Sequence, residues 1–223
     1  DVQRSNIISI NQMPPFRTIK VSESRYVCIW HVDESFDELL SNLNPNKEDL
    51  ALVKSFKNDK KQLEWVAGRA ALKQLCDSLN LEYHGIRKDE HGKPSLLNHK
   101  HEISLTHSYP YIAAIIDETL PVGIDLEQPR EKILRIAHKF LDEEELVFCS
   151  NDISLLNMAW CAKETLYKIH GKRGLIFNEH LKLAPYLSKS ETVITGNIIV
   201  NDTEESYKLR CEVGDKYIIT YNI

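Results

Sequence analysis

Alternation of apolar and polar residues marks several short strands along the chain. The stretches RYVCIWHVD (25–33), EISLT (102–106) and YIAAIID (111–117) are rich in β-branched and aromatic residues, as half-buried or buried strands are. The C-terminal part of the chain adds three more strand candidates, at 192–200, 206–213 and 216–222. The chain therefore contains enough strand material for more than one sheet.

Helical patterns separate these strands. The longest are 59–79 and 154–170, which are rich in helix-forming residues. Asp142 followed by Glu145 resembles a capping box, which predicts that a helix over about 143–149 begins there. Gly and Pro in HGIRKDEHGKPS predict a loop over 84–95. Shorter helices are expected at 35–43, 47–57 and 132–139.

The two long helices share a pattern. Trp65 is followed by Lys73 at the same spacing as Trp160 by Lys168, with alanines between them. We interpret this as an internal duplication, although chance similarity of two amphipathic helices is the alternative. It predicts an α+β fold of two similar halves, 1–118 and 119–223, with a ligand cleft between them.

Composition narrows the class of protein. The chain has 223 residues, 42% of them hydrophobic, and a net charge of −5, so the whole chain does not have the charge of a nucleic-acid binder. No apolar run is long enough to span a membrane, and DVQRSNIISINQMPPF lacks the features of a signal peptide. Without a CxxC pair, reduced thiols and a cytoplasmic location are expected for the five cysteines, Cys28, Cys76, Cys149, Cys161 and Cys211.

The segment VGIDLE (122–127) carries the first candidate chemistry. In a strand, its apolar residues share one face, and Gly123, Asp125 and Glu127 share the other. An edge strand with a solvated polar face is the simplest interpretation. Two neighbouring carboxylates, however, raise each other's pKa unless a cation joins them. Gly123 leaves room for something to approach the strand.

A third acid comes from the helix at 154–170. Glu164 lies four residues from both Trp160 and Lys168, so the three side chains form one stripe, with Lys163 adjacent. Taken alone, Glu164–Lys168 is an ordinary surface ion pair and Trp160 a core residue. Together, Asp125, Glu127 and Glu164 would form a three-carboxylate cage of the kind that suits Mg²⁺. The two lysines would then face phosphate oxygens.

Two further polar residues lie at turns. His107, between Thr106 and Ser108, follows the strand at 102–106, where side chains often point into a site. A histidine there would gain affinity for a phosphate when protonated. His91-Gly92-Lys93-Pro94 is a rigid turn that displays Lys93. Each of these residues also has the simpler interpretation of an exposed surface side chain.

Six sequence blocks, in this order, resemble the 4′-phosphopantetheinyl transferases of the larger, surfactin-synthetase-activating type. They span about 68–172, and GIDLE with a KE…K helix, preceded by SLTHS, is the specific combination. Thr106 stands where serine is usual, and the loop at 171–174 is one residue longer than usual. The blocks are GRAALKQL (68–75), HGKPSL (91–96), ISLTHS (103–108), VGIDLE (122–127), KFLDEEEL (139–146) and WCAKETLYKIHGK (160–172).

The resemblance implies two similar α+β halves related by a pseudo-twofold axis, with coenzyme A bound between them. It also implies an activity. The phosphopantetheine arm of coenzyme A would be transferred to a serine of an apo acyl or peptidyl carrier protein, with adenosine 3′,5′-bisphosphate released. Such an enzyme would require Mg²⁺ or Mn²⁺ and would act in fatty acid, polyketide or nonribosomal peptide biosynthesis.

The resemblance also assigns roles. The metal ligands would be Asp125, Glu127 and Glu164. Glu164 would also be the base for the carrier serine, and Lys168 would stabilise the leaving phosphate. Coenzyme A would be contacted by the remaining candidates: His107 at a phosphate, Lys93 and Thr106 near the nucleotide, Lys163 and Trp160 near the pyrophosphate, and Lys47 at the 3′-phosphate.

Two other functions fit the same residues. One is a Mg²⁺-dependent phosphate-ester hydrolase, and the other is a non-catalytic protein that binds coenzyme A or a carrier. No membrane or nucleic-acid partner is expected, and a monomer is expected because one chain supplies both halves. Carrier proteins are acidic, so docking requires a local basic surface. The candidate is a lysine group that is also explained as a solvated helix face: Lys54, Lys57, Lys60 and Lys61.

Overall fold

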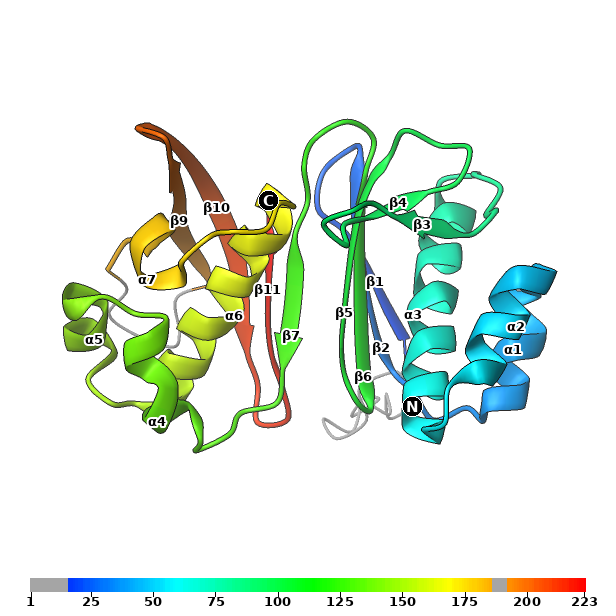
Figure 1. Ribbon diagram of the computed structural model, residues 1–223, viewed down its shortest axis with the longest axis horizontal. Helices are drawn as coiled ribbons and strands as arrows, with labels where there is room; N and C mark the ends of the chain where they lie inside the picture. The colour runs from blue at the N-terminus through cyan, green and yellow to red at the C-terminus, as the bar shows by residue number, and fades with distance from the viewer. Residues whose placement is uncertain (1–15, 186–191) are drawn as a thin grey trace, which may run out of the picture.

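The computed structural model describes residues 16–185 and 192–223, so the N-terminal segment 1–15 considered above lies outside the described residues. It contains two antiparallel sheets (Figure 1). The first has the order β1-β2-β6-β5-β4-β3 and consists of β1 (Phe16–Lys20), β2 (Arg25–His31), β3 (Ile86–Lys88), β4 (Pro94–Leu96), β5 (Glu102–Ser108) and β6 (Tyr111–Asp117). The second has the order β7-β11-β10-β9-β8 and consists of β7 (Ile124–Glu127), β8 (Leu181–Leu183), β9 (Val193–Val200), β10 (Thr203–Val213) and β11 (Ile218–Asn222).

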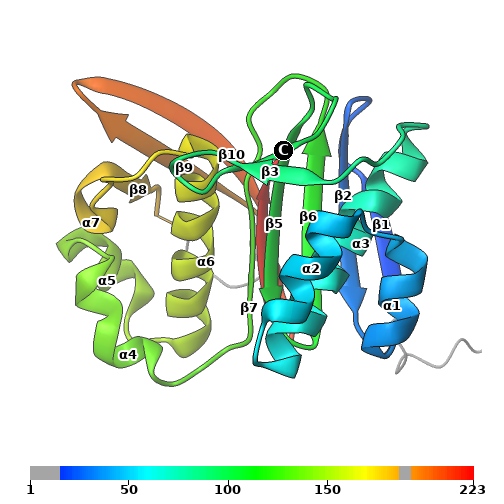
Figure 2. The same ribbon diagram turned by 45° about the vertical axis from the view of Figure 1, so that its right-hand side comes forward.

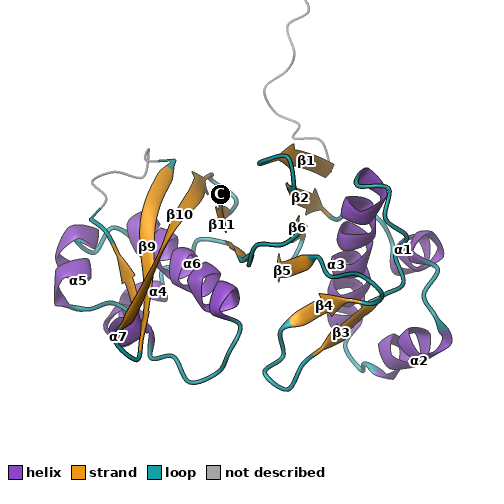
Figure 3. Cartoon of the chain, turned by 90° about the horizontal axis from the view of Figure 1, so that it is seen from above, coloured by secondary structure: helices purple, strands orange, loops and turns teal. Residues whose placement is uncertain are grey.

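Each sheet carries one long helix. Helix α3 (Asp59–Ser78) packs on the first sheet, and α6 (Ile153–His170) packs on the second. Figures 1 and 3 show the two helices on opposite sides of the pair of sheets. The shorter helices lie further out (Figure 2): α1 (Phe36–Leu43), α2 (Lys47–Ser55), α4 (Ile133–Ile136), α5 (Glu143–Cys149), α7 (Phe177–His180) and a 3₁₀ turn (Ala137–Lys139).

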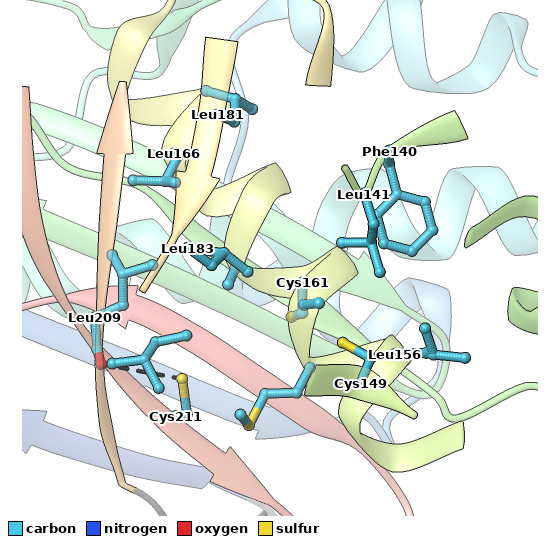
Figure 4. Packing of buried hydrophobic residues seen from close by; sticks show 14 of the residues in the cluster. Phe140, Leu141, Cys149, Leu156, Cys161, Leu166, Leu181, Leu183, Leu209 and Cys211 are labelled. Carbon is cyan, nitrogen blue, oxygen red and sulfur yellow. Dashed lines mark hydrogen bonds between the residues drawn. The ribbon is translucent and has the colours of Figure 1, made fainter. Parts of the chain in front are cut away.

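Three groups of buried apolar side chains hold these layers together. One lies between α3 and the first sheet, and a second contains side chains of α6, of the second sheet and of the segment 133–141, among them Leu166, Leu209 and Phe140 (Figure 4). The third joins the two sheets and contains residues of β2, β6, β7 and β11. The two sheets therefore bury a common apolar layer. The predicted division into 1–118 and 119–223 stays a prediction.

Helix ends follow the expected chemistry. Asp142 accepts a hydrogen bond from the Glu145 amide, and the Glu145 side chain accepts one from the Asp142 amide, which confirms the capping box predicted for α5. At α3, the Asn58 side chain accepts a hydrogen bond from the Lys61 amide, which is a simple N-cap. The six predicted helices agree with the observed ones to within a few residues, except that the segment 132–139 divides into α4 and the 3₁₀ turn.

Several elements differ from the sequence-based expectation. The predicted loop at 84–95 contains β3 and the start of β4, which form a short hairpin around the turn at 89–93. Strands β1 and β8 and helix α7 were not expected. Strand β8, of three residues, and helix α7, of four, are too short for a periodic pattern to develop. Strand β1 is defined by its pairing with β2.

Strand β7 does not have the solvated polar face of an edge strand. Ile124 and Leu126 of β7, together with Val122 just before the strand, belong to the layer between the sheets, and the polar side of β7 is covered by α6. A Cβ atom at Gly123 would lie 2.2 Å from the Thr165 carbonyl oxygen, so only glycine permits this approach of α6. The backbone of a helix is therefore what approaches the strand at Gly123.

A buried ion pair lies where the chain passes from the first sheet to the second. Arg25 Nε lies 2.9 Å from Asp117 Oδ2, and Arg25 Nη1 donates to the Asn222 carbonyl at 3.2 Å. The Asn222 side chain accepts from the Gly123 amide and donates to the Pro121 carbonyl. These bonds connect β2, the linker and the end of β11.

Substitution of Gly123 by alanine should lower the free energy of unfolding by about 1–3 kcal/mol, because the added methyl group overlaps the backbone of α6. Urea denaturation measures this loss. Gly68→Ala is the matched control, since its Cβ would meet only Leu105 at an ordinary 3.7 Å and alanine favours a helix. Equal stability of the two variants would contradict the close approach of α6 at Gly123.

Asp117→Asn should destabilise the protein at neutral pH by about 3–5 kcal/mol, because it leaves Arg25 buried without its counter-ion. Burial raises the pKa of Asp117. Amide hydrogen bonds from Leu120 and Thr119 and the Arg25 charge outweigh burial and lower that pKa. A depressed folded-state pKa contributes stability above the unfolded value of about 3.9, and this stability is lost as pH falls through the folded value.

The difference in unfolding free energy between wild type and Asp117→Asn should therefore shrink on acidification below about pH 4. Urea denaturation at neutral and acidic pH measures it. A difference that stays constant across this range would contradict the assigned titration of Asp117.

Candidate functional site

Asp125 lies between β5 and α6 and is only 4% exposed. Its Oδ1 accepts hydrogen bonds from Thr106 Oγ1 at 3.0 Å and from Lys168 Nζ at 2.7 Å. Its Oδ2 is buried and has no hydrogen-bond partner. A buried carboxylate oxygen without a partner is costly, so this atom is available for a cation or another donor.

The pKa values of Glu127 and Glu164 are affected by the negative charge of Asp125. Burial and the Asp125 charge raise the pKa of Glu127, while a hydrogen bond from Trp160 acts in the opposite direction. Burial and the Asp125 charge also raise the pKa of Glu164, to about 7, against the effect of Lys168. The three acids therefore form one electrostatic group that a cation would stabilise.

The three acids do not form the closed cage expected from the sequence. Within residues 16–185 and 192–223, no group of three or more His, Cys, Asp or Glu side chains is arranged to hold a metal ion. The hard oxygen donors and the unpartnered Asp125 Oδ2 nevertheless fit Mg²⁺, which usually takes one or two carboxylates and completes its shell with water and substrate phosphate.

Lys168 connects the acids to a cavity. Besides Asp125, its Nζ donates to the Ile124 carbonyl at 2.9 Å, and about a quarter of its side chain remains exposed. The cavity, of about 230 Å³, lies between the β3–β4 hairpin, β5 and the end of α6. Its lining residues include four lysines, Lys88, Lys93, Lys168 and Lys172. Such a cavity suits a phosphate-bearing ligand.

Lys93 lies on the β3–β4 turn, as predicted from the sequence, and it lines this cavity. Its Nζ is 2.8 Å from Glu102, and its stem packs against Gly171. In the same region, Arg173 Nε donates to the His91 carbonyl at 3.4 Å. The loop after α6 therefore touches the β3–β4 turn across the two halves.

A second cavity, of about 860 Å³, adjoins the first and shares Lys88 and Leu105 with it. His107 lies on its wall, 51% exposed, with Nδ1 3.4 Å from Glu64. Arg69 lies deeper, 9% exposed, and stacks on Trp65 with its guanidinium carbon 3.4 Å from the ring centre. Its Nη1 donates to the Trp65 carbonyl at 3.4 Å, and its buried Nε has no hydrogen-bond partner.

The role expected of Lys163 is wrong. Lys163 is fully buried, and its Nζ lies 2.7 Å from the Phe140 carbonyl, 3.2 Å from the Phe177 carbonyl and 2.5 Å from Glu145 Oε2. Burial lowers the pKa of Lys163, and the Glu145 charge opposes that shift. With all three protons engaged, Lys163 has none left for a phosphate.

Three other candidate residues, Trp160, Thr106 and Lys47, line neither cavity. Trp160 is stacked on Phe177 and packed edge-on to Phe140, so it is a packing residue that also contacts Glu127. Thr106 points to the opposite face of β5 from His107, and its hydroxyl bonds to Asp125, so it does not face the nucleotide as expected. Lys47 is exposed at the start of α2 and lines neither cavity.

Residues 121–221, which contain the three acids and Lys168, match the family model of the 4′-phosphopantetheinyl transferase superfamily. This match lies in the C-terminal part of the chain, which is therefore similar to this superfamily. It is also similar to the 4′-phosphopantetheinyl transferase gsp of Aneurinibacillus migulanus, with 30% identity over 145 residues. That alignment covers 61% of this chain and 60% of the relative's own length.

Sequence reasoning missed part of this candidate site. Arg69 and Lys88 line the second cavity, but neither was singled out. Arg69 sits in the quoted block GRAALKQL, where a charged residue inside a buried helical stretch was the available signal.

No helix of the described segments is long and apolar enough to span a membrane, in agreement with the sequence.

Lys163→Met should lower the free energy of unfolding by about 3–5 kcal/mol, because it leaves Glu145 buried and unpaired. The double variant Lys163→Met/Glu145→Gln should recover part of this loss, since it removes the unpaired charge. Lys172→Met, at an exposed lysine of the first cavity, is the control and should keep wild-type stability. Wild-type urea stability of Lys163→Met would contradict the structural role.

Proposed function

We propose that this protein transfers the phosphopantetheine arm of coenzyme A to a serine of an apo carrier protein, in a Mg²⁺-dependent reaction that releases adenosine 3′,5′-bisphosphate. The observation that carries the proposal is the contact of Lys168 with Asp125 at the edge of a lysine-lined cavity. The match of residues 121–221 to the superfamily model and the similarity to gsp support the same reaction class.

The arrangement of the two cavities supports coenzyme A as the donor substrate. The molecule carries a pyrophosphate and a separate 3′-phosphate, and the two adjoining cavities each present basic side chains. We assign the pyrophosphate to the first cavity, with Lys93 and Lys168. We assign the nucleotide and 3′-phosphate to the second cavity, with His107 and Arg69.

A bound Mg²⁺ would neutralise charge that develops on the pyrophosphate as its bond breaks. Asp125, Glu127 and Glu164 are the residues that would hold it, with Asp125 contributing Oδ2. Lys168 would donate a proton or a hydrogen bond to the leaving phosphate. Glu164 is the candidate to accept the proton of the carrier serine, since its pKa of about 7 suits a base at neutral pH.

The two sheets with their long helices are proposed to be related by a pseudo-twofold axis, and the protein to act as a monomer. Among the four lysines considered for carrier docking, Lys60 and Lys61 border the second cavity, and their ammonium groups lie over aromatic rings. They are therefore better assigned to the nucleotide than to the carrier.

A Mg²⁺-dependent phosphate-ester hydrolase is the second candidate, because the acids and lysines would serve that reaction too. A non-catalytic binding protein is disfavoured, because this chain carries Glu164 and the charged pair Asp125–Lys168, of which Lys168 lines the cavity. Incubation with coenzyme A distinguishes the two enzymes, since only the transferase modifies a carrier protein.

Wild-type protein with Mg²⁺, coenzyme A and an apo carrier should raise the carrier mass by one phosphopantetheine arm, as mass spectrometry measures. Asp125→Ala should reduce the rate by at least about a hundredfold, because it removes a metal ligand and the partner of Lys168. Asp215→Ala, at an exposed acid remote from the cavities, should keep the wild-type rate. Release of phosphate without carrier modification would favour the hydrolase.

The apparent Mg²⁺ affinity should fall as pH decreases below about 7. Protons compete with the metal for the Glu164 carboxylate, whose pKa of about 7 in the metal-free protein means that it is ionised above this pH and protonated below it. The Mg²⁺ concentration for half-maximal rate should rise up to about tenfold per pH unit in this range. A Glu164→Gln variant that keeps the same dependence would remove Glu164 from the metal site.

A further inference from the structure

A row of three hydroxyl groups on β5 faces the outer edge of β7. Ser104 Oγ accepts the Ile124 amide at 3.4 Å, Thr106 Oγ1 accepts the Leu126 amide at 3.3 Å, and Ser108 Oγ accepts the Gln128 amide at 3.4 Å. Each hydroxyl lies 20 residues before its partner, so the row holds β7 in a fixed register against the first sheet.

Thr106 differs from its two neighbours because its proton has a defined acceptor in the site. A hydroxyl donates one hydrogen bond, and the Thr106 hydroxyl donates to Asp125 Oδ1 at 3.0 Å while its oxygen accepts from Leu126. Ser108 instead accepts from the backbone amide and the side chain of Gln128, and it makes no contact with the acids. Only the central hydroxyl therefore links the β5–β7 interface to the acids.

We infer that Thr106 is a positioning residue for the metal site, acting through Asp125 and not through coenzyme A; this inference rests on the proposed function. The hydroxyl and Lys168 both occupy Oδ1, which leaves Oδ2 as the unpartnered oxygen. Both donors fix the rotation of the carboxylate, and Thr106 does so from a buried, β-branched side chain with restricted χ1 freedom.

The loss of metal affinity expected on removing the Thr106 hydroxyl follows from hydrogen bonds to metal ligands in other proteins. A hydrogen bond to a metal-binding carboxylate orients it, and loss of such a bond typically lowers metal affinity by about 10–100-fold. Thr106→Val preserves the shape of the side chain and removes the proton. Thr106→Ser restores the proton with a less restricted rotamer.

The test measures Mn²⁺ binding directly by electron paramagnetic resonance, in which free Mn²⁺ gives a signal that decreases on binding. Wild type, Thr106→Val, Thr106→Ser and the matched control Ser108→Ala are titrated as full chains, with and without adenosine 3′,5′-bisphosphate. Ser108→Ala also removes a hydroxyl from the row but leaves Asp125 untouched. Circular dichroism checks that each variant is folded.

We expect Mn²⁺ affinity to fall at least about tenfold in Thr106→Val and to stay within about threefold of wild type in Thr106→Ser and Ser108→Ala. An affinity of Thr106→Val within about threefold of wild type overturns the inference. An equal loss in Ser108→Ala also overturns it, because the effect would then come from the β5–β7 interface in general. If Thr106→Val does not fold, Thr106→Ala replaces it under the same thresholds.

The same experiment separates this inference from the proposed function. Suppose that wild type binds Mn²⁺ and Thr106→Val loses affinity, but no apo carrier is modified. The proposed role of Thr106 is then supported, and the proposed transferase reaction is contradicted. If wild type transfers the arm but Mn²⁺ affinity does not depend on the Thr106 hydroxyl, the proposed reaction is supported and the proposed role of Thr106 is contradicted.

Discussion

The fold and the candidate site both depend on how strand β7 is held along its two edges. One edge pairs with β11 through backbone hydrogen bonds, with Asp125 opposite Thr220. The other edge meets the hydroxyl row of β5, in which Ser104 and Thr106 accept β7 amides and Ser108 accepts the amide of Gln128 just after the strand, each 20 residues further along the chain. Because side chains satisfy these amides, the two sheets remain separate sheets while β7 is hydrogen-bonded to both of them.

Helix α6 is positioned against this strand from two sides. Gly123 allows the helix backbone to approach β7, and the Thr165 hydroxyl bonds to Thr220 of β11. On the far side, Lys163 joins α6 to Glu145 of α5 and to the carbonyls of neighbouring segments. A side chain one position from Glu164 thus fixes the helix, which places Glu164 and Lys168 beside the acid of β7. Adjacent residues of a helix point in different directions, so one can serve packing and the other the site.

Much of this arrangement could be predicted from the sequence, because it depends on local patterns. Periodicity located the long helices and strands, and the GIDLE and KE…K blocks identified Asp125, Glu164 and Lys168. The assignment of Lys163 failed because sequence spacing does not show which helix face is covered by α5. Strands β3 and β8 and the cavity residue Arg69 were missed because three-residue strands and a buried charge are defined by their tertiary neighbours. Thr106 was placed correctly on a strand, but its partner lies on another strand that only the fold brings near.

The central claim is that Asp125 and the two basic cavities together bind a metal and the phosphates of coenzyme A. A crystal structure of the protein with Mn²⁺ and coenzyme A, with the metal located by anomalous scattering, tests this claim most directly. The account predicts a manganese peak at Asp125 Oδ2, with pyrophosphate oxygens beside Lys168 and the nucleotide next to His107 and Arg69. A manganese peak remote from Asp125, or coenzyme A bound outside both cavities, would contradict it.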